Sequence, residues 1–474
     1  MTSKCVALFA LFASFAHAQF GRGGGDWMAV GGDAQRTASV RTDPHISVEA
    51  VQGGVMQSLW KIKLSGVPTP PVVGSRLITY KGFKDLLYVG TSSDNVVSID
   101  HVVGKVFWET HLPYDSLLVP VKTGTATCPA GMTAAVSLAA RLAPPVPDAG
   151  RGGRGPGGPP AGPGRGGNMN TAPVPTLPRP RRTPGTVYVL SSDGLIHVLN
   201  QHTGADIVPA ARFIRGNAKA HDLIQVGNVV YAVTSDGCGG APNGVWAIDL
   251  ADNMVNEWKT GEASVLGLAF ATDGTVFATT TRGIAALEAK TLKVRQEQAG
   301  GFTTPPLVFK VKDKEYVAAG NGDQGVVLLD AAALGVVGSG SVGRGKIGSA
   351  LASWEDADSK TRWILTARGP NIVGFKVVEQ NGSTALEQAW LSLPMASPAP
   401  PIVVNGVVFV LSPGTPTTPA VLCALDGMTG KLLWSSGKAI AGYSTTGISS
   451  GASQVFVGTH DGTLYAFGYL LPRE

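Results

Sequence analysis

The chain has 474 residues, of which 44% are hydrophobic and only 15% charged, and it contains 63 glycines and 32 prolines. This length would allow two or three domains, but few segments keep a helical period, and short alternating runs bounded by glycine, asparagine and aspartate recur throughout. The formal net charge of +5 comes from six arginines against one aspartate within residues 143–185 and from Lys4, so the remaining body is near −1. We therefore expect an all-β protein, and the charge distribution excludes a nucleic-acid-binding surface on its body.

Residues 1–18 have the pattern of a secretory signal peptide. Lys4 precedes an apolar run over Val6–Phe15, and Ala16-His17-Ala18 places small residues at both positions of a cleavage site. The run is much shorter than the roughly 20 apolar residues of a membrane-spanning helix. We expect cleavage before Gln19, a mature protein in the periplasm or outside the cell, and no insertion into a membrane.

One unit recurs along the rest of the chain: an aromatic-bearing strand, an Asp-Gly-like turn, a strand ending near Ala-Leu-Asp, a Thr-Gly-Lys-like turn and a strand ending in tryptophan. Its first aromatic residues are Tyr88, Tyr188, Tyr231, Phe277, Tyr316, Trp363, Phe409 and Phe456. After Tyr188 they follow one another at intervals of 39–47 residues, which fits a four-stranded propeller blade. Eight anchors predict an eight-bladed β-propeller of four-stranded antiparallel blades over residues 19–474.

The first interval is longer because it contains residues 143–185, which are rich in glycine, proline and arginine. Few side chains in this segment could offset the cost of ordering it, so we predict a disordered insert between the first and second strands of the second blade. Its Arg-Gly-Gly tract is of a type that can bind single-stranded nucleic acid. In an exported protein we expect a solvated loop and no nucleic-acid partner.

The two ends of the repeat array complement each other. The last unit ends near Phe467 without a fourth strand, and Ser58–Lys63 near the N-terminus is an unassigned fourth-strand motif. We expect the two to pair, because this would close the ring and remove an exposed sheet edge. The tryptophans that share one position of the unit are expected to pack between adjacent sheets; they are Trp60, Trp108, Trp258, Trp390 and Trp434.

The unit at residues 424–434, Ala-Leu-Asp-x-x-Thr-Gly-Lys-x-x-Trp, resembles the repeat of the quinoprotein (pyrroloquinoline quinone repeat) propellers. Pro-Pro-Val-Val at 70–73, with its echoes at 305–308 and 400–403, and the opening segment 26–36 are also similar to that family. The resemblance covers nearly the whole mature chain and implies the propeller fold. It leaves two functions open, since the family includes dehydrogenases that hold the quinone with Ca²⁺ on the axis and periplasmic scaffolds that bind protein segments.

Candidate binding residues lie in the loops that lead from one blade into the inner strand of the next, because these loops open at the mouth of the channel. Those that could hold an anion such as the quinone, or stack on it, are Lys219, His221, Arg344, Lys346 and Tyr443. The alternative is that all five are solvated loop residues. Ca²⁺ needs six to eight oxygen ligands, and only Glu262 and Asp222 qualify here, so no metal site is predicted. No Ser/His/Asp arrangement is readable.

Three cysteines remain once Cys5 leaves with the signal peptide. We expect Cys128 in the loop that enters the inner strand of the second blade, Met132–Leu142, and Cys238 in a turn of the third blade. Both connections open on the same face of neighbouring blades, and the expected compartment is oxidising. A Cys128–Cys238 disulfide is therefore predicted, with Cys423 as a buried thiol; the alternative is three free thiols.

The sequence thus favours an exported, monomeric propeller that acts as a binding or scaffold protein. Its expected partner is a protein segment or a small anionic ligand at the channel mouth. The alternative is a pyrroloquinoline quinone-dependent dehydrogenase that oxidises an alcohol or a sugar and uses the quinone with Ca²⁺ as cofactors. The residues assign no catalytic group for that reaction.

Overall fold

The structure is a computed structural model that describes residues 26–54, 56–79, 81–112, 122–123, 126–128, 131–142, 185–322, 325–340, 347–380 and 382–469. The predicted signal peptide lies outside these residues, and so does the predicted insert except for Gly185. Within the described ranges, no helix is long and apolar enough to cross a membrane.

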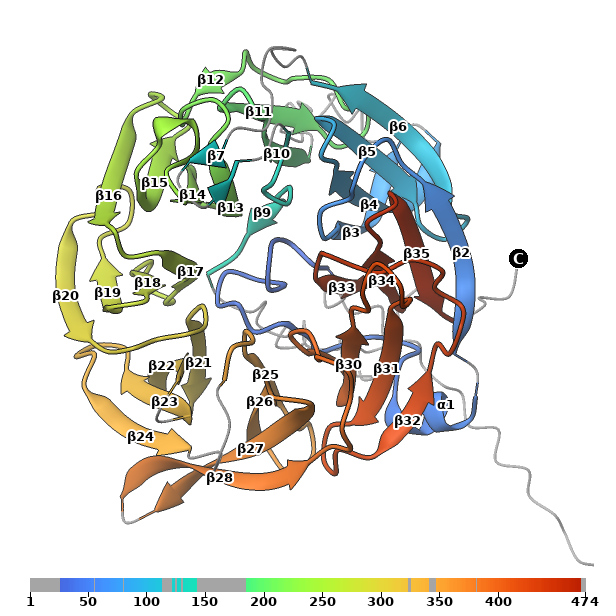
Figure 1. Ribbon diagram of the computed structural model, residues 1–474, viewed down its shortest axis with the longest axis vertical. Helices are drawn as coiled ribbons and strands as arrows, with labels where there is room; N and C mark the ends of the chain where they lie inside the picture. Colours follow the sequence, from blue (N-terminus) through green and yellow to red (C-terminus); the bar gives the residue numbers. More distant parts are fainter. Residues whose placement is uncertain are drawn as a thin grey trace, which may run out of the picture.

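Eight small sheets surround a central axis, which confirms the eight-bladed propeller (Figure 1). From the inner to the outer strand, the first blade is β3 (Val72–Thr79), β4 (Gly82–Gly90), β5 (Asn95–Asp100) and β6 (Lys105–His111). The second blade contains β10 (Thr186–Leu190), β11 (Leu195–Asn200) and β12 (Ala211–Arg212). The third is β13 (Lys219–Val226), β14 (Val229–Ser235), β15 (Asn243–Asp249) and β16 (Val255–Gly261). The fourth is β17 (Val265–Phe270), β18 (Val276–Thr280), β19 (Gly283–Leu287) and β20 (Val294–Ala299).

The other four blades follow in the same order around the ring. The fifth is β21 (Leu307–Val311), β22 (Lys314–Asn321), β23 (Gly325–Asp330) and β24 (Val336–Gly340). The sixth is β25 (Ala352–Glu355), β26 (Arg362–Arg368), β27 (Asn371–Gln380) and β28 (Ser383–Leu391). The seventh is β29 (Ile402–Val404), β30 (Val407–Ser412), β31 (Val421–Asp426) and β32 (Leu432–Ser435). The eighth is β33 (Ile448–Gly451), β34 (Gln454–Gly458), β35 (Thr463–Gly468) and β2 (Gln57–Lys63).

Each of the eight aromatic anchors lies in the second strand of its blade, where the side chains are buried between sheets.

The second blade departs from the four-stranded plan. Its inner segment is bridged to Tyr188 of β10 through Ser137, but β9 (Ala139–Ala140) then pairs in parallel with β13 of the next blade. The inner segment therefore divides its backbone hydrogen bonds between two blades and does not form one regular strand.

The ring closes as the sequence predicts. β2 pairs antiparallel with β35, so that Ser58 lies opposite Phe467 and Lys63 opposite Thr463. The N-terminal strand thereby becomes the outer strand of the last blade, beside the C-terminal part of the chain (Figure 1). In the chain, α1 (Val48–Gln52) separates the axial residues from β2, and it lies beside β32 of the seventh blade; its N-terminus is capped by the Ser47 side chain.

The shared tryptophans pack against the neighbouring blade. Three indole N–H groups donate to backbone carbonyls there: Trp60 to His101 (2.6 Å), Trp108 to Gln201 (2.8 Å) and Trp390 to Gly427 (3.0 Å). Each of these indoles also lies over a turn glycine of the next blade. At Gly104, for example, φ is 65° and a Cβ atom would lie 2.5 Å from Trp60 Cγ, so only glycine fits there. Trp434 instead contacts Phe467 edge to face at 5.8 Å.

A feature that the sequence did not predict is the axial segment, residues 26–46, which occupies the centre of the ring. Its backbone carbonyls accept hydrogen bonds from the inner parts of six blades, through the N–H groups of Val73, Leu138, Phe270, Val308, Ser353 and Val403. Asp43 accepts bonds from Ser453 of the eighth blade, and Arg36 reaches the third. β1 (Ser39–Val40) lies within the segment and pairs in parallel with β29.

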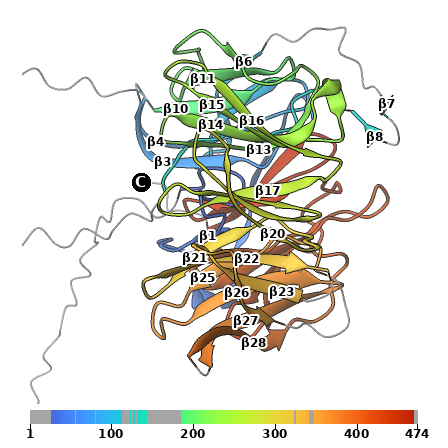
Figure 2. The same ribbon diagram turned by 90° about the vertical axis from the view of Figure 1, so that its left-hand side faces the viewer.

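The two faces of the ring differ in what they carry. We call the face on which the inner strands begin the mouth face; it carries the loops between blades and faces the viewer in Figure 1, with β7 (Lys122–Thr123) and β8 (Ala126–Thr127). These two strands lie at the right in Figure 2, whereas the C-terminus lies at the left. Two described residues that lie next to the N-terminus and to the insert are on the side away from the mouth. Asp26 accepts a hydrogen bond from the Ser75 amide of β3, and Leu142 lies beside Gly274 in the turn that follows β17.

Candidate functional site

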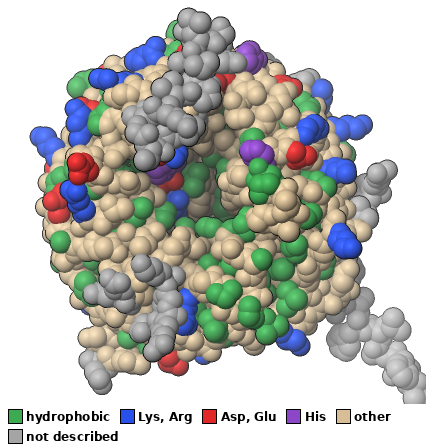
Figure 3. Space-filling model, in the orientation of Figure 1, with side chains coloured by type: hydrophobic (Ala, Val, Ile, Leu, Met, Phe, Trp, Pro, Cys, Tyr) green, Lys and Arg blue, Asp and Glu red, His purple; other side chains and the backbone are tan. Residues whose placement is uncertain are grey.

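The centre of the mouth face is hollowed, as Figure 3 shows, and a cavity of about 120 Å³ lies there. The axial segment forms its floor through Trp27, Gly31, Arg36 and Ala38. Its walls are the first residues of four inner strands and the residues before them. These wall residues are Pro70 and Pro71 of the first blade, Ala350 and Leu351 of the sixth, Pro400, Pro401 and Ile402 of the seventh, and Gly447 and Ile448 of the eighth.

A buried ion pair joins the floor of this cavity to the third blade. The Arg36 Nη1 atom lies 2.7 Å from Asp222 Oδ2, and the two side chains are only 12% and 7% exposed. Asp222 lies in a bulge of β13, and the Leu268 amide also donates to its carboxylate at 2.9 Å. Burial alone would raise the pKa of the Asp222 carboxyl, but Arg36, His221 and the Leu268 amide together hold that pKa well below its usual range. The carboxylate is therefore ionised and already has a cation.

Of the predicted anion-binding residues, the three that the structure describes each have a neighbouring side chain as a partner. Lys219 begins β13 and pairs with Asp236 at 2.6 Å. His221 lies 3.6 Å from Asp222 and is one-third exposed. Tyr443, which precedes the eighth blade, stacks on His460 with ring centroids 4.8 Å apart. Arg344 and Lys346 lie outside the described residues.

The described residues also do not fit a quinone held with Ca²⁺. Of the two carboxylates that the loops offer, Asp222 is paired with Arg36, and the Glu262 side chain is 92% exposed beside Arg282. No cluster of three or more His, Cys, Asp or Glu side chains that could hold a metal occurs in the described part of the chain. The cavity of about 120 Å³ is also well below the roughly 300–1,000 Å³ of typical small-molecule sites.

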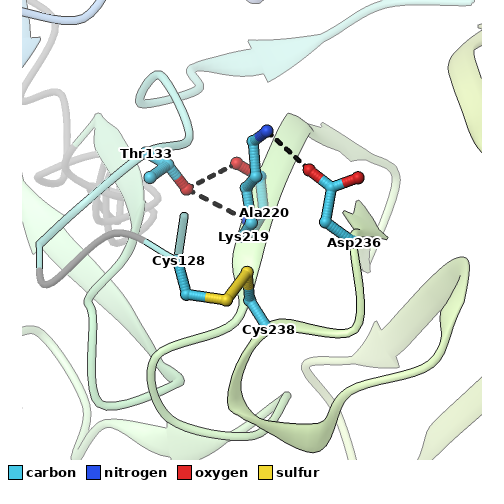
Figure 4. The surroundings of a disulfide bond; sticks show 6 residues. All are labelled: Cys128, Thr133, Lys219, Ala220, Asp236 and Cys238. Carbon is cyan, nitrogen blue, oxygen red and sulfur yellow. Dashed lines mark hydrogen bonds and ion pairs between the residues drawn. A yellow bond between two sulfur atoms is a disulfide. The ribbon is translucent and has the colours of Figure 1, made fainter. Parts of the chain in front are cut away.

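Beside this centre, a disulfide joins Cys128 to Cys238, with Cα atoms 5.3 Å apart (Figure 4). This is the pair expected from the sequence. Next to it, the Thr133 hydroxyl donates to the Ala220 carbonyl at 2.7 Å and accepts from the Ala220 amide at 3.0 Å. The inner segment of the second blade is thus joined to β13 of the third by covalent and polar contacts. Cys423 is buried, which raises the pKa of its thiol.

The structure brings together a serine, a histidine and an aspartate that we did not recognise in the sequence. His197 Nδ1 lies 3.2 Å from Asp206 Oδ2, and His197 Nε2 lies 3.2 Å from Ser191 Oγ. The Ser191 hydroxyl is buried and donates to Asp193 of its own turn at 2.5 Å. Thr459 makes the same turn contact with Asp461 in the eighth blade. Ser191 therefore takes part in a repeated turn, in which its hydroxyl has the Asp193 carboxylate and the Leu195 carbonyl as acceptors besides its contact with His197.

One part of the mouth face carries almost no charge. The loops there, residues 392–401, 413–420 and 436–447, contain a single charged residue, Lys438. Leu393 is 74% exposed in the first of these loops. In Figure 3, hydrophobic side chains gather over β25–β32 and around the central hollow, while charged side chains lie mostly toward the rim. An exposed apolar area beside a cavity is typical of a binding surface.

Comparison with known proteins supports the fold. No protein-family model and no curated protein matches the sequence. In structure, the chain is similar to a quinohemoprotein alcohol dehydrogenase from Comamonas testosteroni (TM-score 0.58, 12% identity, 95% of this chain and 81% of that one). It is also similar to a europium-containing methanol dehydrogenase (TM-score 0.59, 12% identity, 94% of this chain and 98% of that one). A third similar structure is BamB from Moraxella catarrhalis (TM-score 0.52, 12% identity, 89% of this chain and 99% of that one). The resemblance to quinoprotein propellers is thus confirmed as a likeness of fold.

Proposed function

We propose that this protein is an exported binding or scaffold protein built on a quinoprotein-like propeller, and that its mouth face binds a segment of another protein. The Arg36–Asp222 pair carries the proposal. A guanidinium from the protein's own axial segment neutralises the buried axial carboxylate, so this group is engaged in structure and is not available as a cation ligand or a base. The uncharged part of the mouth face gives a partner an apolar surface on which to bind.

The alternative, a quinone-dependent dehydrogenase, has the same fold in its favour. The described residues give it no further support, because the axial cavity is small and its one charged lining group, Arg36, is already paired. A small anion at Lys219 is also a weaker candidate than a protein segment, since that ammonium is paired with Asp236. Signal-peptide cleavage and export are part of the proposal and rest on the sequence pattern of residues 1–18.

Site-specific photo-crosslinking in the native host tests this function. A photo-reactive amino acid is placed at Leu393 on the mouth face or, as the matched control, at Phe83 near the start of β4 on the opposite face; the two side chains are 74% and 76% exposed. We expect a crosslinked adduct of discrete mass from position 393 and none from position 83. Equal adducts from both positions, or none from position 393, would contradict a binding role for the mouth face.

A further inference from the structure

We propose that the axial cavity is the anchor pocket of the mouth face, and that it receives one leucine-sized apolar side chain from an uncharged segment of the partner protein. This inference rests on the proposed function, because it names what the mouth face binds and where. Interfaces owe most of their affinity to a few side chains held in enclosed pockets near the centre. The cavity lies at the centre of this face and is continuous with the uncharged loops.

The size and lining of the cavity define the class of side chain that it accepts. About 120 Å³ is close to the volume of apolar cavities that bind a single benzene-sized group. The walls include Pro70, Pro71, Pro400 and Pro401, which have no N–H group to offer a polar ligand. Apart from Arg36, the lining residues are apolar or glycine, so an aliphatic side chain would be favourably buried, whereas a polar one would lose its water and gain few partners.

Among the described residues that line the cavity, Arg36 is the charged one, and its guanidinium has donors left for a ligand. Among the described residues its guanidinium donates one hydrogen bond, to Asp222. A guanidinium has five N–H donors, so Arg36 can donate to a backbone carbonyl of the bound segment as well. Because the charge of the Arg36 guanidinium is already neutralised by Asp222, Arg36 does not require a negatively charged ligand.

The low charge of the loops around the cavity determines the charge that the rest of the bound segment can carry. Leu393, Pro394 and Met395 lie in one flanking loop, and Pro416 and Pro419 in another, with Lys438 as the single charge in the three loops of this part of the face. An uncharged segment can lie over these loops without the cost of desolvating charges. The described residues nearest to the chain ends, Asp26 and Tyr469, lie toward the other face, so neither of these two residues lies over this surface.

Two cavity-filling variants test the anchor pocket. A Cβ atom at Gly447 would have only Pro70 Cγ nearby, at 3.9 Å, so the backbone tolerates Gly447→Leu and the new side chain fills the cavity. Ala350→Leu fills it from the sixth blade. Gly335→Leu is the matched control, since a Cβ atom there meets nothing within 4 Å and the turn lies on the opposite face. Thermal unfolding of each variant checks that the fold is intact.

The probe is a short, capped, uncharged peptide with one central leucine, compared by calorimetry with the same peptide carrying alanine. We expect saturable binding of the leucine peptide and binding of the alanine peptide weaker by about tenfold or more. Both filling variants should lose a similar factor, and Gly335→Leu should bind like the unmodified protein.

Equal binding of the two peptides, or binding unaffected by the filling variants, would overturn the anchor pocket. If Leu393→Glu then abolished that binding, the mouth face would remain a binding surface and only the anchor would be wrong. Absence of saturable binding by either peptide would also overturn the anchor, and crosslinking at position 393 would decide the proposed function separately.

Discussion

At the scale of single residues, Arg36 and Asp222 determine what the axis of the ring can hold. Asp222 has φ 53° within its bulge, and Gly267 makes room for its carboxylate, because a Cβ atom at Gly267 would lie 2.4 Å from Asp222 Oδ2. The two charges are buried together, so neither can be removed without leaving the other unpaired in a poorly solvated place. The pair therefore fixes the axial segment to the third blade.

Substitution of Arg36 by alanine should destabilise the protein strongly. It leaves the Asp222 carboxylate buried without its cation, a change that costs about 3 kcal/mol or more of unfolding free energy. Arg36→Lys, which keeps the charge, should lose less. Chemical denaturation of the two variants checks this. A loss below about 1 kcal/mol for Arg36→Ala, as for an exposed ion pair, would show that the pair contributes little.

His101 should make the stability depend on pH. It lies at the seam between the first and eighth blades, is 1% exposed and meets the Phe456 ring edge-on at 5.9 Å. Burial lowers the pKa of its imidazole more than Asp85 and Asp100 raise it. The unfolded chain then binds the proton more readily, so stability is complete above the unfolded pKa of about 6.5 and falls as the pH drops below it.

Unfolding titrations between about pH 7.5 and pH 5.5 test this for the original protein and for His101→Phe, which keeps an aromatic ring at the seam. We expect the phenylalanine variant to lose less stability on acidification. If both proteins lose the same amount, the acid sensitivity has another source.

At the scale of elements, one N-terminal stretch performs two tasks. Residues 26–46 fill the axis, and β2 completes the eighth blade. Both contacts involve residues from distant parts of the chain, for example Ser58 with Phe467 and Asp43 with Ser453. The ring therefore cannot be completed until its last blade is available, as expected for a fold that is dominated by contacts of long sequence separation.

Deletion of residues 19–64 should consequently open the ring and give insoluble protein, because it exposes the edge of β35 and empties the axis. Deletion of residues 19–25 alone is the control and should leave the protein soluble. The soluble fraction and size-exclusion profile after expression distinguish the two cases. A soluble, monodisperse product of the longer deletion would contradict the role of the N-terminal stretch.

The disulfide should stabilise the junction of the second and third blades. It closes a loop of 110 residues, and replacement of Cys128 and Cys238 by serine should lower the unfolding free energy by about 2–4 kcal/mol. Peptide mapping of the purified protein without reduction should recover a linked pair that contains both cysteines. Three alkylatable thiols in the native protein would refute the bond.

At the scale of the whole molecule, the features that repeat were predictable and those that occur once were not. The aromatic anchors, from Tyr88 to Phe456, mark all eight second strands, since every blade buries the same position between sheets. Ring closure followed from a missing strand at one end and a spare one at the other. The axial segment has no period to detect, because most of the blades that its backbone contacts receive only one or two hydrogen bonds from it.

The difference between repeated and single features also limits how much of the site can be predicted from the sequence. Arg36 and Asp222 are 186 positions apart, and no local pattern links them. The meeting of Ser191, His197 and Asp206 depends equally on the blade's register. Candidate residues chosen by loop position alone, such as Lys219 and Tyr443, prove to have partners of their own. Fold-level likeness to the alcohol dehydrogenases therefore does not extend to a matching site in the described residues.

The central proposal is that this protein, whose axis is filled by residues 26–46, is a binding or scaffold protein and not a quinone-dependent dehydrogenase. Absorbance titration of the purified protein with pyrroloquinoline quinone and Ca²⁺, followed by dye-linked assays with alcohols and sugars, tests this claim most directly. We predict no saturable spectral change and no oxidation. Micromolar quinone binding that is abolished by Arg344→Ala or Lys346→Ala, together with substrate oxidation, would contradict the account and identify the protein as a dehydrogenase.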